Sequence, residues 1–251
     1  MPNRSINPFV EFPVPPKFYY LWEDFDDELA LTSNLPVAAS SRWVGTALSS
    51  GTFAQSTDEA FGVAVLSGAA TTDNSGAQIQ GDMEYATLVA GKRLQYFCRA
   101  KLSDATNTHF FNGLALTDTT LCDGADGVAG MTATDAVGFY KADDAATVAF
   151  LVKRDSAVLS NLTLATMADD TYYWFAFEVV MDSTTAGLGT LQAWVFNGTN
   201  GTLIATSGPI QSATLPYSAE EVHTLSVGLV SGNATGTKTA TIDAIGMLQE
   251  R

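Results

Sequence analysis

The chain is dominated by a nearly unbroken succession of short strand-like runs separated by turns. In one such run Leu225, Val227 and Leu229 alternate with Ser226 and Gly228, the period-two pattern of a β-strand with two different faces. Glycine, asparagine, aspartate and serine separate the runs. We identify about fourteen runs, at 17–25, 41–49, 60–69, 76–81, 91–103, 108–118, 136–144, 146–155, 157–165, 171–182, 189–199, 201–208, 222–232 and 237–249.

This pattern predicts an all-β fold, either a two-sheet sandwich or a barrel, and of these we favour a two-sheet antiparallel β-sandwich. No window shows a helical stripe of useful length, and no internal repeat suggests a propeller or solenoid. Only 16% of the residues are charged, and threonine, serine, alanine and glycine take their place, as on β-rich surfaces with many turns. A length of 251 residues suits one large sandwich domain, which we place at 17–251.

Two features indicate what this domain buries. Alternation along 91–103 places Cys98 on one strand face, which we expect to be buried together with Leu94, Tyr96, Ala100 and Leu102. The run 171–182 is apolar on both faces, which we interpret as a strand inside the sandwich core. Cys122 follows in a turn, and we expect both thiols to be reduced and unlinked.

Residues 1–16 stand apart as an extended proline-rich N-terminal arm. Five of the eight prolines lie there, and proline excludes a helix or a central strand. The arm is also too apolar for a solvated linker. Two interpretations stay open, because the arm could cover an edge of its own sheet or dock on a partner. The candidate docking residues of the arm are Ile6, Pro8, Phe9, Val10, Phe12, Pro13, Val14, Pro15 and Pro16.

Charge and hydropathy exclude several classes of partner. With 12 basic and 27 acidic side chains the net charge is −15, which opposes binding to nucleic acid. No apolar run reaches the length of a membrane-spanning helix, so we expect no membrane partner. The N-terminus has no apolar segment of signal-peptide length, so we expect no cleaved leader.

Six segments in order resemble the concanavalin-like (laminin-G-like) jelly-roll proteins found among the structural genes of tailed phages. The resemblance implies two twisted antiparallel sheets with Greek-key crossovers and a first strand that pairs with the last. Such proteins commonly decorate capsids or form parts of fibres, and the same fold also occurs in lectins and glycanases. The carrying segments are 22–28, 88–104, 110–119, 135–155, 168–182 and 239–251.

The acidic and nucleophilic residues do not form a catalytic pattern. A glycanase on this fold would need two carboxylates flanking the sugar bond, usually with acid-x-acid spacing on one strand. The acidic clusters are instead adjacent pairs or lie where strands end, and such aspartates normally cap turns. His109 and His223 have no nucleophile context. We therefore predict no catalytic residue, metal ligand or cofactor. The clusters are Glu23-Asp24, Asp26-Asp27-Glu28, Asp143-Asp144 and Asp169-Asp170.

Two binding possibilities stay open beside that prediction. Asp118, Asp123 and Asp126 could supply hard oxygen ligands for calcium from one glycine-containing loop, although the EF-hand spacing is absent. Trp43, Trp194 and Tyr217 could stack on sugars, although each is more often a packing residue.

Trp194 and Phe196 share a strand face with Gln192, and an exposed patch of these two rings would indicate a contact surface. We therefore add both to the candidate docking residues.

The sequence and the resemblance together favour a non-enzymatic virion structural protein. The leading hypothesis is a capsid decoration (cement) protein on the outer surface of a tailed-phage head, made in the host cytoplasm. Its expected partners are the major capsid protein and further copies of itself, with a trimer as one arrangement. The alternatives are a carbohydrate- or receptor-binding module of a tail fibre and, third, a glycan hydrolase on the same fold.

Overall fold

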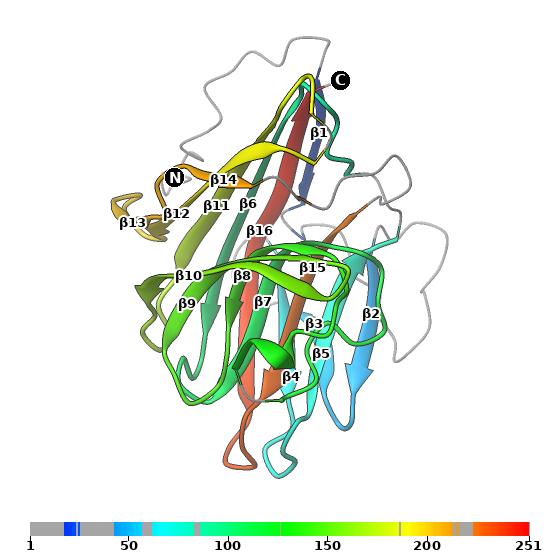
Figure 1. Cartoon of the computed structure of the whole chain (residues 1–251). Coiled ribbons are helices and arrows are strands. Elements are labelled where there is room, and N and C mark those ends of the chain that lie inside the picture. The colour runs from blue at the N-terminus through cyan, green and yellow to red at the C-terminus, as the bar shows by residue number, and fades with distance from the viewer. Residues whose placement is uncertain are drawn as a thin grey trace.

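The computed structural model describes residues 18–23, 25, 43–56, 62–82, 86–125, 127–185, 187–212, 215 and 223–250. Within them the chain forms two packed antiparallel sheets and a single 3₁₀ turn, η1, at Gly127–Gly130 (Figure 1). The strands are β1 Phe18–Glu23, β2 Trp43–Leu48, β3 Thr52–Ser56, β4 Val63–Gly68, β5 Gly76–Gly81, β6 Arg93–Leu102, β7 Thr108–Ala115, β8 Ala136–Lys141, β9 Thr147–Arg154, β10 Ala157–Thr166, β11 Tyr173–Met181, β12 Gly189–Asn197, β13 Leu203–Thr206, β14 Ile210–Ser212, β15 Thr224–Ser231 and β16 Lys238–Glu250.

The strand order is that of a jelly roll. A nine-stranded sheet runs β13-β12-β11-β6-β16-β4-β3, with β1 paired to β16 and β14 paired to β12. A seven-stranded sheet runs β10-β9-β8-β7-β15-β5-β2. The prediction of an all-β two-sheet antiparallel sandwich is confirmed, and so is the implied pairing of the first strand with the last.

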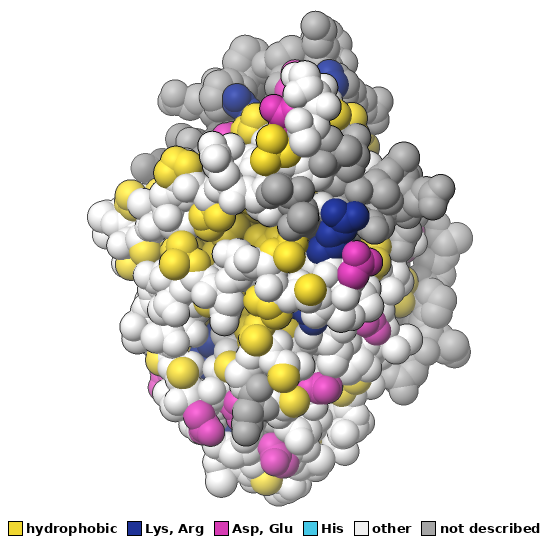
Figure 2. Space-filling model, viewed as in Figure 1, with side chains coloured by type: hydrophobic (Ala, Val, Ile, Leu, Met, Phe, Trp, Pro, Cys, Tyr) yellow, Lys and Arg dark blue, Asp and Glu magenta, His cyan; other side chains and the backbone are white. Residues whose placement is uncertain are grey.

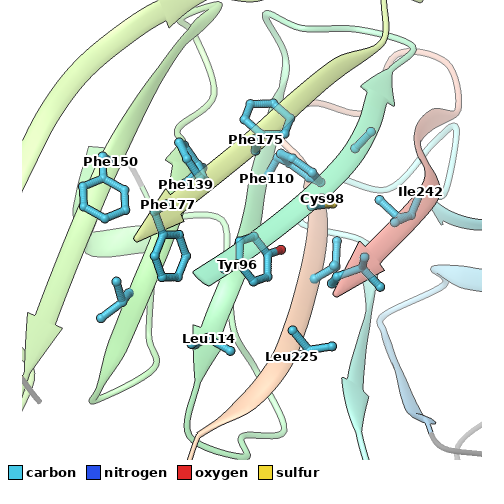
Figure 3. Close-up of a cluster of buried hydrophobic side chains, with 14 of the residues drawn as sticks. Tyr96, Cys98, Phe110, Leu114, Phe139, Phe150, Phe175, Phe177, Leu225 and Ile242 are labelled. Carbon is cyan, nitrogen blue, oxygen red and sulfur yellow. The ribbon is translucent and has the colours of Figure 1, made fainter. Parts of the chain in front are cut away.

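The core lies between the sheets and follows the period-two pattern of the sequence. On β6, Leu94, Tyr96, Cys98, Ala100 and Leu102 are all buried in it, as the alternation predicts. Figure 3 shows aromatic rings from both sheets meeting in this layer. The ring of Phe177 on β11 stacks on that of Tyr96, with 4.9 Å between centroids. The Tyr96 hydroxyl donates to Asn112 Oδ1 on β7 at 3.3 Å and so satisfies a polar group in the core.

The sequence pattern misses two short strands. β3 and β14 have five and three residues with mostly partial burial, too few for a clear alternation.

Cys98 and Cys122 are free and buried, in agreement with the expected thiols. Burial raises the pKa of both thiols.

The arm at 1–16 lies outside the described residues, so the boundary between arm and sandwich stays a prediction. No helix among the described residues is long and apolar enough to span a membrane.

The packing of the core predicts that substitutions at two positions of β11 change the stability of the protein by very different amounts. Phe177→Ala should lower the free energy of unfolding by roughly 3–5 kcal/mol, because it removes a ring in contact with Tyr96, Phe139 and Phe150. Val180→Ala, three residues along the strand and 38% exposed, should change it by about 0.5 kcal/mol or less. Urea denaturation of both variants measures the difference, and equal effects would contradict this packing.

Candidate functional site

The outer face of the seven-stranded sheet is covered by the chain's own loop between β7 and β8, residues 116–135. This β7–β8 loop contributes Leu121, Cys122 and Met131 to a second buried apolar cluster. The sheet contributes side chains that point away from the main core, among them Phe111 on β7 and Tyr140 on β8. Figure 1 shows η1, which belongs to this loop, lying over the face of the sheet. A surface that a sandwich could leave open for a ligand is therefore filled.

Two glutamines of β5 hold the start of the loop through its backbone. Gln78 donates to the Asp118 carbonyl at 2.6 Å and accepts from the Leu121 amide at 2.7 Å. Gln80 accepts from the Asp118 amide at 2.9 Å and donates to the Leu116 carbonyl at 3.1 Å. Both amides are buried, so loss of any of these bonds would leave a desolvated polar group.

Buried polar side chains of the sheet hold the rest of the loop. Lys153 on β9 donates to the Met131 carbonyl at 2.5 Å, and the Tyr140 hydroxyl donates to the Gly127 carbonyl at 2.8 Å. His109 on β7 lies under the same segment, with Nδ1 3.1 Å from the Tyr140 hydroxyl and Nε2 3.1 Å from a carboxylate oxygen of Asp143.

Burial favours the neutral forms of His109, Tyr140 and Lys141. Burial lowers the pKa of His109, against the opposing charge of Asp143. Burial also raises the pKa of Tyr140 and lowers that of Lys141 to about 8. Lys141 donates to the carbonyls of Thr108 and Ala142. These contacts fix backbone segments of the sheet and of the loop that covers it.

The strands of the seven-stranded sheet carry no carboxylate. None of the seven contains an aspartate or a glutamate. On the outer face of β5 the positions with i, i+2 spacing are occupied by Gln78 and Gln80, whose amides cannot act as a general acid or base near neutral pH.

Three of the acidic residues singled out in the sequence have structural partners. Asp143 lies beside His109, Asp169 accepts from the Ala105 amide at 2.7 Å, and Glu23 accepts from the Phe25 amide at 2.9 Å. Asp24, Asp26, Asp27 and Glu28 lie outside the described residues.

The described part of the proposed calcium loop uses its carboxylates for turns. Asp118 accepts from the Thr120 amide at 3.0 Å, and Asp123 accepts from the Ala125 amide at 2.8 Å. Asp126 lies outside the described residues. Among the residues that are described, no group of three or more His, Cys, Asp or Glu side chains could hold a metal ion.

The outer face of the nine-stranded sheet carries an aromatic band, which we define as Trp22, Phe97, Trp174, Trp194 and Phe196. The strand register sets it in two adjacent rows. The first row runs Trp22, Gly246, Phe97, Ala176, Trp194 from β1 to β12, and the second runs Ala244, Arg99, Trp174, Phe196 from β16 to β12.

Contacts within the band are close. The ring centroids of Trp22 and Phe97 are 5.1 Å apart, and Phe97 and Trp174 are each 4% exposed. Trp22, Trp194 and Phe196 are partly exposed. The buried indole N–H of Trp174 finds no hydrogen-bond acceptor in the described structure. The face is therefore apolar but carries one desolvated donor.

Charged side chains border the band. Arg99 Nη1 contacts the Asp243 carboxylate at 2.6 Å, its Nε donates to the Gly198 carbonyl at 3.0 Å, and its guanidinium lies 4.0 Å from the centroid of the Tyr172 ring. On the other side of the band, Glu178 accepts from Gln95 at 2.7 Å.

Two of the five band residues were candidates in the sequence. Trp194 and Phe196 share a face with Gln192, as the alternation predicts, and the structure turns that face away from the core. Trp43 is a packing residue and does not suit sugar stacking, because its side chain is 3% exposed and packs on Phe25. Tyr217 lies outside the described residues.

Three band residues were not predicted. The signal for Trp174 was the run 171–182, apolar on both faces. Its second face is part of this band on the outside of the nine-stranded sheet, and only its first face is in the main core.

The buried histidine predicts a pH dependence of stability. Because the folded pKa of His109 lies below its unfolded value of about 6.5, the unfolded state binds the extra proton as the pH falls. The contribution of His109 to the free energy of unfolding should be constant above that pH and should decrease as the pH falls through it. Denaturation between pH 8 and 5 should show a smaller decrease for His109→Gln. An unchanged slope would contradict the assignment.

Comparison with known proteins identifies the fold. No family model matches the chain, and no curated protein matches its sequence. Among solved structures, a protein of unknown function from Shewanella oneidensis MR-1 is 14% identical with a TM-score of 0.60, covering 93% of this chain and 87% of that one. An endo-1,3-β-glucanase from Streptomyces sioyaensis is 10% identical with a TM-score of 0.57, covering 94% and 98%.

A third similar structure comes from a phage. The CBM2 module of the evolved Dit of Lactobacillus casei BL23 phage J-1 is 11% identical with a TM-score of 0.55, covering 92% of this chain and 96% of that one. At these identities the likeness concerns architecture alone. The chain has the concanavalin-like jelly-roll fold that is shared by lectins, glucanases and a phage carbohydrate-binding module.

Proposed function

We propose that this chain is a non-enzymatic virion structural protein, a decoration protein that binds the major capsid protein on the outer surface of a tailed-phage head. Support comes from two features of the described structure. The seven-stranded sheet has no carboxylate on any strand and is covered by the β7–β8 loop, while the nine-stranded sheet presents an aromatic band.

The missing carboxylates carry the non-enzymatic part of the proposal. Glycoside hydrolysis requires one carboxylic acid and one carboxylate placed across the scissile bond. Gln78 and Gln80 have acid-x-acid spacing on β5, but their amides bind the loop backbone. The loop that they hold packs on this face of the sheet.

The aromatic band carries the docking part. Trp194 and Phe196 offer aromatic area at low entropic cost, and such rings dominate the binding energy of protein interfaces. In this proposal the arm at 1–16 adds Phe9 and Phe12 to the contact, and the protein reaches the capsid exterior after synthesis in the host cytoplasm.

The proposal predicts loss of capsid binding when the band is truncated. The double variant Trp194→Ala with Phe196→Ala should bind depleted capsids at least tenfold more weakly, because hot-spot aromatics each contribute about 2 kcal/mol or more. Thr190→Ala, on the same strand and the same face, is the matched control and should bind like the parent. Co-sedimentation with capsids measures both. Parental affinity in the double variant would refute docking through the band.

A carbohydrate- or receptor-binding module of a tail fibre is the second candidate. The observation that favours it is the shared face of Trp194 and Gln192, a ring beside an amide, on a fold that resembles lectins and a phage carbohydrate-binding module. Binding of host surface glycan, lost in Trp194→Ala and kept in Thr190→Ala, would favour this candidate over capsid docking. Release of reducing sugar would instead support the third alternative, a glycan hydrolase.

A further inference from the structure

The β7–β8 loop is closed on itself above the sheet that it covers. At its base the Leu116 amide donates to the Asp135 carbonyl at 3.2 Å and ties the two ends of the loop together. Further along, the Thr132 amide donates to the Leu121 carbonyl at 3.0 Å. Loops whose ends lie close together are held largely by their own contacts. The segment between Leu121 and Thr132 can therefore move as one piece without breaking a strand ladder.

The side chains beneath this segment belong to the second buried apolar cluster. Cys122 and Met131 of the loop pack there with Phe111 of β7 and Leu151 of β9. None of the four belongs to the main core between the sheets. Movement of the segment would therefore uncover an apolar face and leave the main core intact.

Different side chains hold the two parts of the loop. The near part is bound by the two glutamines of β5, whose amides do not titrate near neutral pH. The far part, which we define as residues 122–131, is bound by two ionisable groups. The Tyr140 hydroxyl donates to the Gly127 carbonyl, and Lys153 donates to the Met131 carbonyl.

His109 lies beneath the far part, one contact away from it. Its Nδ1 is 3.1 Å from the same Tyr140 hydroxyl that binds Gly127. The imidazole is fully buried, and Figure 2, which shows the side of the molecule on which η1 lies, has no histidine atom at the surface. β15, which also pairs with β7, carries no ionisable side chain. The ionisable groups that face His109 are Tyr140, Lys141 and Asp143 from β8 and the segment after it, and Asp123 from the loop.

The closed loop keeps this histidine neutral. Burial lowers the pKa of His109, the positive charge of Lys141 adds to this effect, and the negative charges of Asp143 and Asp123 oppose it. A proton on the buried ring would place a charge in a site that water does not reach. Removal of the far part of the loop would admit water to that site.

We propose that the far part of the β7–β8 loop is an acid-released cover, which leaves the outer face of the seven-stranded sheet when His109 binds a proton. Release lets water solvate the new charge, and it exposes apolar side chains such as Phe111 and Leu151. The near part stays bound to the glutamines and acts as the tether. This inference concerns the isolated protein and is independent of the capsid proposal.

The direction of the pH effect follows from the two states of the cover. In the closed state the pKa of His109 lies below about 6.5, and in the open state water returns it to about that value. The open state therefore binds the extra proton as the pH falls through that value. The equilibrium between the two states should be constant above it and should shift toward the open state by up to about thirtyfold at pH 5.

The two cysteines of the chain provide the test and its internal control. Both are free and buried, but Cys122 lies under the cover whereas Cys98 lies in the main core. We expect an aromatic disulfide reagent that stays reactive in weak acid to label Cys122 faster as the pH falls. Relative to free cysteine at each pH, the rate should rise at least tenfold from about pH 7.5 to about pH 5. Cys98 should stay protected, and mass spectrometry of the digested protein distinguishes the two sites.

Two variants connect the release to the proposed contacts. His109→Gln should remove the rise in Cys122 labelling. Tyr140→Phe deletes the hydroxyl that binds Gly127, so Cys122 should be labelled about fivefold faster than in the parent already at about pH 7.5. Circular dichroism checks that both variants are folded, and the Tyr140→Phe result and the two parental thiols still decide the matter if His109→Gln is not.

Four results would overturn the proposal. They are a relative rate at Cys122 that does not change with pH, an equal rise at Cys98, an undiminished rise in folded His109→Gln, and parental labelling in Tyr140→Phe. An equal rise at both cysteines would indicate global unfolding in acid. None of these results bears on capsid docking.

Discussion

The pairing of β16 within the nine-stranded sheet determines which side chains meet in the core and which meet in the aromatic band. This thirteen-residue strand pairs with β6 along one side and with β1 and β4 along the other (Figure 1). Side chains such as Ile242, Ile245 and Met247 enter the main core from it. Its irregular pairing between Ile242 and Ala244 sets the register of everything on the β1 side relative to β6. Without that register Trp22 would not stand beside Phe97, and the aromatic band would lack one end.

The outer faces of the two sheets are built in different ways. A sheet that packs a core on one side must still place its other side against water or a partner. On the seven-stranded sheet the chain supplies its own cover, and the buried amides of Gln78 and Gln80 and the buried Lys153 hold that cover through backbone atoms. On the nine-stranded sheet aromatic side chains occupy the corresponding place. One lectin-like architecture therefore carries two outer faces of different chemistry.

Much of the fold can be predicted from the alternation of side chains along the strands. The candidate site can be predicted only in part. Alternation predicted the buried face of β6 and the common face of Trp194 and Phe196, because neighbours two apart on a strand must point the same way. It could not assign Trp174, since a strand apolar on both sides gives no sign of which side meets the core. Nor could it find the cover over the seven-stranded sheet. Gln78 and Gln80 bind backbone groups some forty residues away, and backbone partners leave no pattern of residue types.

The central place of β16 has a kinetic consequence. In a chain made from the N-terminus, this strand leaves the ribosome after β1, β4 and β6, the three strands with which it pairs. Until then the nine-stranded sheet is three separate pieces, β1, the β3–β4 pair and the group that contains β6, β11 and β12, and the core-facing side chains of β6 and β11 have no complete layer around them. Non-local pairing of this kind folds slowly and exposes apolar surface during synthesis. Nascent chains of this protein should therefore depend on chaperones that shield the earlier strands until β16 has been synthesised.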